Sequence, residues 1–107
     1  MANIYKNSKV DLTTTNITTL YTAPSATTAS VRSILVSNDS GSDDTITLTI
    51  TNSASALFSI YKNEEVGALS SKELLSQPLI VMESEILKVT AATAGRLHVV
   101  ASYLEIT

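Results

Sequence analysis

The stretch TITLTI, residues 45–50, alternates threonine with isoleucine or leucine without interruption. Successive side chains of a β-strand point to opposite faces, so Ile46, Leu48 and Ile50 would share one face and the threonines the other. An amphipathic helix would instead need apolar residues three and four positions apart. The stretch therefore predicts a strand with one face in a core and the other face rich in hydroxyl groups.

Similar alternation recurs along the chain, between short segments that contain proline, glycine, asparagine or aspartate. Many short strands with such turn residues between them are typical of an all-β antiparallel sandwich. The sequence leaves immunoglobulin-like and jelly-roll strand orders open. We expect about eight strands, at residues 4–12, 18–23, 31–37, 45–51, 57–62, 79–82, 86–91 and 97–106.

One segment fits this pattern poorly. Residues 70–77, SSKELLSQ, begin like a capped helix because Ser70 precedes Glu73 by three positions. Pro78 would end any such helix after a single turn. We therefore expect residues 70–77 to form a crossing loop with at most one helical turn.

A chain of 107 residues has the usual size of one domain, so we expect a single domain over residues 1–107. Residues 1–12 would be either an edge strand or an N-terminal arm. Hydrophobic residues make up 44% of the chain and charged residues 16%, below the roughly 25% of soluble domains. Because a sparsely charged surface favours association, this composition favours an assembly of subunits over a free monomer.

The composition also excludes several kinds of partner and site. The net charge is −3 and the lysines and arginines are scattered, which argues against nucleic-acid binding. The lack of cysteine excludes disulfides and thiolate metal sites. The longest apolar run, PLIVM at residues 78–82, is too short to cross a membrane, and the first residues lack the apolar region of a secretory signal. We expect no membrane partner, and synthesis in the cytoplasm of a host.

An acidic cluster, NDSGSDD at residues 38–44, precedes the alternating stretch and is a candidate cation site. Its acids bunch together, whereas a calcium loop alternates them and ends in a glutamate, where this chain has Thr49 and Ile50. Asparagine and aspartate bond their own backbone in turns, and Gly41 would supply a positive φ. We therefore expect a hairpin turn, with a weak cation site as the open alternative.

The remaining candidates for catalysis are His98, the single histidine, and the pairs Glu64–Glu65 and Glu83–Glu85. No G-x-S-x-G motif, P-loop or dinucleotide fingerprint accompanies them. Adjacent glutamates on a strand point to opposite faces, and Glu83 and Glu85 flank a turn, where solvated acids are common. We predict a non-enzymatic protein with no catalytic residue, no bound metal and no cofactor.

The last predicted strand, residues 97–106, has apolar residues on both faces. A sandwich of this size covers only one of them, so a neighbouring subunit or a closely packed loop would have to cover the other. The first face carries Leu97, Val99 and Tyr103, and the second carries Val100, Leu104 and Ile106. The N-terminal segment is a second candidate contact, pairing with the exposed sheet edge of a neighbour. The predicted interface is Ile4, Tyr5, Val10, Leu12, Val100, Leu104 and Ile106.

Nearly the whole chain resembles small β-sandwich structural proteins of tailed-bacteriophage virions. The resemblance lies in VDLTTTNITTLYTAP at residues 10–24, SILVSND at residues 33–39 and PLIVMESEILKVTA at residues 78–91. It implies a capsid decoration (cement) protein on the capsid exterior. The implied partners are further copies of the chain, in a homotrimer, and the major capsid protein or other virion proteins.

Two alternative functions remain open. The first is a neck, tail or baseplate component, because the same module could stack around a symmetric tube. The second is a module that binds host glycans, which would need Tyr5, Tyr21, Tyr61 and Tyr103 to cluster at an exposed groove, because sugars stack on aromatic rings.

Overall fold

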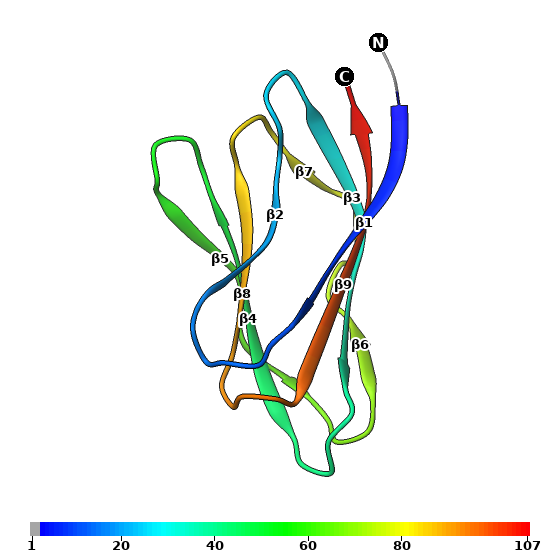
Figure 1. The fold of residues 1–107 in the computed structure, drawn as a ribbon, viewed down its shortest axis with the longest axis vertical. Helices are drawn as coiled ribbons and strands as arrows, with labels where there is room; N and C mark the ends of the chain where they lie inside the picture. The colour runs from blue at the N-terminus through cyan, green and yellow to red at the C-terminus, as the bar shows by residue number, and fades with distance from the viewer. Residues whose placement is uncertain (1–2) are drawn as a thin grey trace.

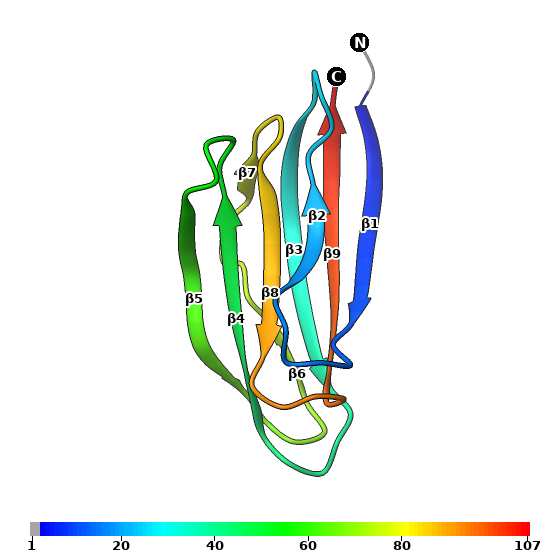
Figure 2. The same cartoon turned by 60° about the vertical axis from the view of Figure 1, so that its left-hand side comes forward.

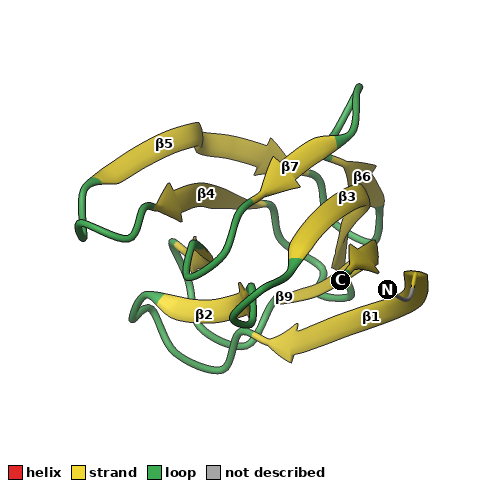
Figure 3. Cartoon of the chain, turned by 90° about the horizontal axis from the view of Figure 1, so that it is seen from above, coloured by secondary structure: helices red, strands yellow, loops and turns green. Residues whose placement is uncertain are grey.

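The alternating stretches fold into antiparallel strands. The computed structural model describes residues 3–107, which contain nine strands and no helix, so none of these residues could span a membrane as a helix (Figures 1 and 3). The strands are β1 (Asn3–Asp11), β2 (Thr18–Thr22), β3 (Thr28–Asn38), β4 (Asp44–Thr51), β5 (Leu57–Val66), β6 (Ser71–Glu73), β7 (Leu79–Val81), β8 (Ile86–Ala91) and β9 (Leu97–Ile106).

Two sheets make up the sandwich, and all their pairings are antiparallel. The larger sheet has the order β1-β9-β3-β6, with β7 also paired to β3, and the smaller has the order β2-β8-β4-β5 (Figure 2). Strands therefore pair in a nested way: the first with the last, β2 with β8, β3 with β6 and β7, and β4 with β5. This nesting is the jelly-roll order. The predicted antiparallel sandwich is confirmed, and the immunoglobulin-like order is excluded.

The core lies between the two sheets. Six of its largest side chains have no exposed surface, and burying each contributes roughly 1.5–3 kcal/mol. These six are Leu12, Ile34, Ile46, Leu48, Leu87 and Leu97. The stretch TITLTI behaves as predicted at Ile46 and Leu48, whereas Ile50 is only partly buried. The register of β4 against β5 shifts between Ile46 and Thr49, which changes how the end of β4 meets the core.

The acidic cluster is a corner between the sheets and not a hairpin, because β3 belongs to the larger sheet and β4 to the smaller. Its conformation depends on the buried Asn38, whose amide donates to the carbonyl oxygens of Ser42 (2.8 Å) and Val66 (3.1 Å). The Asn38 side-chain oxygen accepts from the backbone N–H of Ser40 at 2.9 Å. Gly41 does not have the positive φ that we expected. Among the described glycines only Gly95, in the turn before β9, adopts one.

Residues 70–77 contain a short strand in place of the helical turn that the sequence allowed. β6 pairs with β3 from Leu35 to Ser37, and the Ser70 hydroxyl donates to the carbonyl of Gly67. The Glu73 side chain turns to β3, where it accepts hydrogen bonds from the Ser33 hydroxyl and the Ile34 N–H. Of the predicted capping pair, Ser70 therefore closes the turn before β6, and Glu73 fixes β6 to β3.

Candidate functional site

The side of the larger sheet that faces away from the core is partly apolar and is left uncovered by the described residues. The strand register places Tyr5, Leu104, Ser30 and Ile80 in one row across β1, β9, β3 and β7. Val100 of β9 lies opposite Leu35 of β3 in a second row, farther along the same face of the sheet. We call this surface the outer face and define its apolar members as Tyr5, Leu35, Ile80, Val100, Leu104 and Ile106.

Exposure distinguishes the outer face from an ordinary sheet surface. Tyr5 is 73% exposed, Ile80 51% and Leu35 41%, whereas Val100 and Leu104 are half-buried between their neighbours. These side chains come from four strands, so the apolar surface runs across the sheet and is not a single scattered residue. The prediction that β9 has a second, uncovered apolar face therefore agrees with the folded chain.

The predicted interface residues separate into three groups by burial. Ile4, Tyr5, Val100, Leu104 and Ile106 all keep solvent-exposed surface, and Val10 is partly buried against the core. Leu12 was expected at the surface and is instead fully buried in its own core.

The chain turns inward at Leu12 because the backbone groups of this residue are held by the first residue of β9 and by the turn before it. Its N–H donates to the Leu97 carbonyl at 3.0 Å, and its carbonyl accepts from the Gly95 N–H at 2.9 Å. The predicted N-terminal segment also includes residues 1 and 2, which lie outside the described residues.

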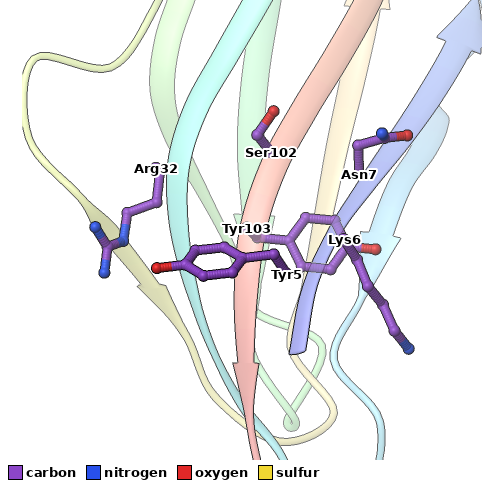
Figure 4. A pocket seen from close by; sticks show the side chains of 6 residues that line it. All are labelled: Tyr5, Lys6, Asn7, Arg32, Ser102 and Tyr103. Carbon is purple, nitrogen blue, oxygen red and sulfur yellow. The ribbon is translucent and has the colours of Figure 1, made fainter. Parts of the chain in front are cut away.

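A shallow depression of about 420 Å³ lies across β1, β9 and β3 (Figure 4). Its lining residues are Tyr5, Lys6, Asn7, Arg32, Ser102 and Tyr103. The Tyr5 side chain points across β9 toward Arg32 in this view. Arg32 falls at the register shift of β3 between Val31 and Ser33, where a bulge re-aims a side chain. The depression therefore offers an aromatic ring and a guanidinium group beside the outer face.

Behind this depression a polar cluster connects the two sheets. Glu105, buried on β9, forms a salt bridge with Lys6 at 2.8 Å and accepts a hydrogen bond from the Tyr21 hydroxyl at 2.6 Å. The rings of Tyr21 and Tyr103 lie 4.2 Å apart between centroids, and the Tyr103 hydroxyl is 2.8 Å from that of Ser8. The cluster supplies hydrogen-bond partners for groups that would be costly to bury alone.

The protonation states in this cluster suit a structural role. The hydrogen bonds from Lys6 and then Tyr21 lower the pKa of Glu105, so it remains an ionised acceptor. Burial, followed by the hydrogen bond to Glu105, raises the pKa of Tyr21 well above its ordinary range. A general acid needs a raised carboxyl pKa and a nucleophilic tyrosine a lowered one, and the two shifts here run in the opposite directions.

The other catalytic candidates are also held in structural contacts. Glu64 forms a salt bridge with Lys72, while the carboxylates of Glu83 and Glu85 accept backbone N–H groups near the turn between β7 and β8. These acids pair with cations or amides and not with one another across a cleft. The contacts of Glu64, Glu83 and Glu85 are those of acids that hold turns and strands in place.

His98 lies in a row with Asp11 of β1 and Ser37 of β3 on the outer face. Its Nε2 is 3.3 Å from a carboxylate oxygen of Asp11, and its Nδ1 is 3.9 Å from one of Asp39. Both nitrogens therefore face carboxylates, and no hydrogen bond joins His98 to the Ser37 hydroxyl within residues 3–107. A serine nucleophile needs the imidazole as its base, so this geometry is not that of a catalytic triad.

The aspartates at the end of the acidic corner accept hydrogen bonds from backbone N–H groups. Asp43 accepts a hydrogen bond from the Ala68 N–H, and Asp44 accepts from the N–H groups of Thr45 and Thr93. In the part of the chain that the structure describes, no three histidine, aspartate or glutamate side chains are grouped so as to hold a metal ion. The carboxylates of Asp43 and Asp44 thus help to hold the corner between β3 and β4 in its conformation.

The tyrosine cluster required by glycan binding is not formed. Tyr21 and Tyr103 are buried, and Tyr61 packs against the core, which leaves Tyr5 as the strongly exposed member of the set. The glycan-binding prediction is therefore wrong on its own criterion. Alternation of the sequence shows which residues share a strand face but not which sheet covers that face, so burial of Tyr21 and Tyr103 could not be read from it.

Comparisons with known proteins bear on the fold. No protein-family model matches the chain, and no curated protein matches its sequence. A chain in the structure of the infectious bursal disease virus Gx strain aligns over 96% of this chain, with a TM-score of 0.52 and 13% identity. A chain in the structure of the Gt strain of that virus aligns over 98%, with a TM-score of 0.49 and 13% identity.

The present chain spans only 28% of the Gx strain chain and 30% of the Gt strain chain. At 13% identity, the likeness to the Gx strain chain shows a shared fold. The shared architecture is the antiparallel β fold described above, as it occurs in a virus structure. It does not single out proteins of tailed bacteriophages.

Proposed function

We propose that the chain is a non-enzymatic structural protein of a bacteriophage virion, which acts as a capsid decoration (cement) protein. The observation that carries the proposal is the outer face, where apolar side chains from four strands remain exposed. Burying apolar surface contributes about 25 cal/mol per Å², so a chain with such a face gains free energy when a partner covers it. The resemblance of the sequence to virion proteins and the fold shared with a chain of a virus structure support the same role.

The proposed partners are further copies of the chain, in a homotrimer, and the major capsid protein or other virion proteins. The outer face supplies Tyr5, Val100, Leu104 and Ile106, and the adjoining edge supplies Ile4 and Val10. A cement protein adds buried area across the joints between subunits, and symmetry multiplies a modest area many times. The chain would therefore lie on the capsid exterior and strengthen the shell without any chemical step.

A neck, tail or baseplate component is the second candidate. The elongated form of the chain, with extents of 45 × 26 × 22 Å, favours it, because long narrow modules can stand side by side around a symmetric tube. The two roles differ in copy number. A shell component is present on the order of hundreds of copies per particle, and a tail or neck component on the order of tens or fewer.

A binding experiment tests the proposal on the particle whose genome encodes the chain. Leu35→Asp places a charge on the outer face, and we expect it to reduce binding to particles that lack the chain at least about tenfold. Leu57→Asp is the matched control, because Leu57 has a similar exposure (50% against 41% for Leu35) but belongs to the smaller sheet. Equal binding by both variants, or no wild-type chain in an image reconstruction of the particle, would overturn the role.

A further inference from the structure

The four sheet edges of the sandwich differ in how well they are protected against pairing. β2 has five residues and a register shift, and β5 is interrupted by two shifts in its pairing with β4. The edge beyond β3 is divided into β6 and β7, with three residues each. Native proteins protect free edges with short or bulged strands in this way. Three of the four edges are therefore poor templates for another strand.

β1 is the exception. It has nine residues and pairs with β9 without a register shift, from Asn3 opposite Ile106 to Asp11 opposite His98. Seven of its residues are exposed and two are half-buried, and none is a proline. Figure 2 shows β1 at the margin of the larger sheet, with β9 as its neighbour and no strand beyond it. The backbone groups on its free side therefore form a long, regular edge with which another strand could pair.

We infer that β1 pairs antiparallel with β1 of a second copy of this chain, around a twofold axis at Asn7. Asn7 is the middle residue of the strand, so this register pairs all nine residues. It places Ile4 opposite Val10, which is an aliphatic pair, and Tyr5 opposite Lys9, where an ammonium group can lie on an aromatic ring. The other opposed pairs are Asn3 with Asp11 and Lys6 with Ser8.

Other twofold registers are less complementary. An axis at Lys6 or at Lys9 sets two ammonium groups directly against each other, which destabilises a strand pair. An axis at Ser8 leaves Asn3 and Ile4 unpaired and sets Lys6 against Val10. The side chains of β1 are therefore most complementary to those of a second copy when the two strands pair in the register centred on Asn7.

The pairing has a consequence for the outer face. A twofold axis perpendicular to the sheet keeps the outer faces of both copies on the same side. The two apolar surfaces then form one continuous surface across the joined sheets. The inference rests on the assembly role proposed above and gives it a partner and a register at this edge. A twofold contact joins only two copies and uses the edge residues Ile4 and Val10, so the contact that would build a trimer would use the outer face instead.

Disulfide trapping tests the register, because the chain contains no cysteine of its own. Opposed residues of an antiparallel pair lie about 4.5–5.5 Å apart between Cα atoms, within the range of a disulfide. We expect the Asn7→Cys variant to form a linked dimer under mild oxidation. In the Lys9→Cys variant the two cysteines would lie about 13 Å apart, so this matched control should remain unlinked. A mixture of the Tyr5→Cys and Lys9→Cys variants should yield the mixed dimer.

A charge variant provides a second measurement that does not depend on cysteine. We expect Asn7→Lys to weaken dimerisation at least about tenfold in light-scattering measurements, because two lysines then meet at the axis. Asn16→Lys, the same change in an exposed loop, should leave dimerisation unaltered.

The pairing would be overturned if the Asn7→Cys variant kept its β circular dichroism but formed no disulfide-linked dimer. It would also be overturned if the Lys9→Cys variant, tested without a second variant, formed a linked dimer. Equal masses for Asn7→Lys and Asn16→Lys in light scattering would overturn it as well. If particle binding still depends on Leu35 in that case, the pairing at β1 fails while the assembly role stands.

Discussion

Three threonines of β4 have different surroundings although they alternate identically in the sequence. The Thr47 hydroxyl accepts a hydrogen bond from the Asn63 N–H at 3.1 Å. The hydroxyl oxygens of Thr49 and Thr51 are buried and have no hydrogen-bond partner among the described residues. Thr51 lies between Ile86 of β8 and Leu57 of β5. A buried hydroxyl without a partner costs free energy that a methyl group of the same size does not.

Thr51→Val should therefore raise the free energy of unfolding by about 1 kcal/mol. Urea denaturation followed by circular dichroism measures this change, and the dependence on urea should stay the same if the fold is unaltered. Thr47→Val is the matched control, because it removes an acceptor that is in use and should lower stability. Equal effects of the two substitutions would show that the Thr51 hydroxyl has a partner in solution.

At the scale of the element, Glu73 fixes the short strand β6 to β3. Burial raises the pKa of Glu73, but the hydrogen bonds from the Ser33 hydroxyl and the N–H groups of Ile34 and Leu75 outweigh it, so the net shift is downward. A three-residue strand has few backbone bonds to hold it in place. One ionised side chain thus supplies three of the contacts at this edge.

Glu73→Gln should loosen this edge, because an amide replaces one acceptor oxygen with a donor. We expect faster hydrogen exchange at the Ile34 and Leu75 amides and a loss of about 0.5–1 kcal/mol in unfolding free energy, because Glu73 is exposed and water screens its charge. Glu65→Gln serves as the control, since Glu65 is exposed and its side chain has no ion pair or hydrogen bond within residues 3–107. An unchanged rate of hydrogen exchange at the Ile34 amide in the Glu73→Gln variant would contradict the role of Glu73 in fixing β6 to β3.

At the scale of the whole molecule, the bond between Tyr21 and Glu105 joins the smaller sheet to the larger. The pKa of Glu105 is lowered in the folded chain, first by Lys6 and then by Tyr21. Its contribution to stability is therefore complete above the ordinary glutamate pKa of the unfolded chain. That contribution is lost as the pH falls through the lower pKa of the folded chain.

Glu105→Gln should lower the unfolding free energy by about 1–3 kcal/mol at neutral pH, because it breaks a buried charged contact. The difference from the wild type should shrink below the ordinary glutamate pKa and vanish in stronger acid, where both side chains are neutral. Thermal unfolding measured from neutral to acidic pH checks this. A difference that stays constant with pH would mean that Glu105 acts through packing and not through its charge.

The sequence by itself determined the antiparallel sandwich, the second apolar face of β9 and every strand except the short β6. Each follows from local alternation, because neighbouring side chains of a strand must point to opposite faces. The outer-face residues Val100, Leu104 and Ile106 could be named for the same reason. The lack of cysteine and the scattered cations also limited the possible chemistry without reference to any contact.

The tertiary structure alone decided the jelly-roll order, the burial of Leu12 and the two buried tyrosines, and the role of residues 38–44 as a corner between sheets. It also decided that β1 is the one long regular edge. These features depend on which strands, far apart in the sequence, lie side by side. Such pairings are fixed by packing of the whole core, and alternation within one strand has the same form whichever neighbour that strand acquires.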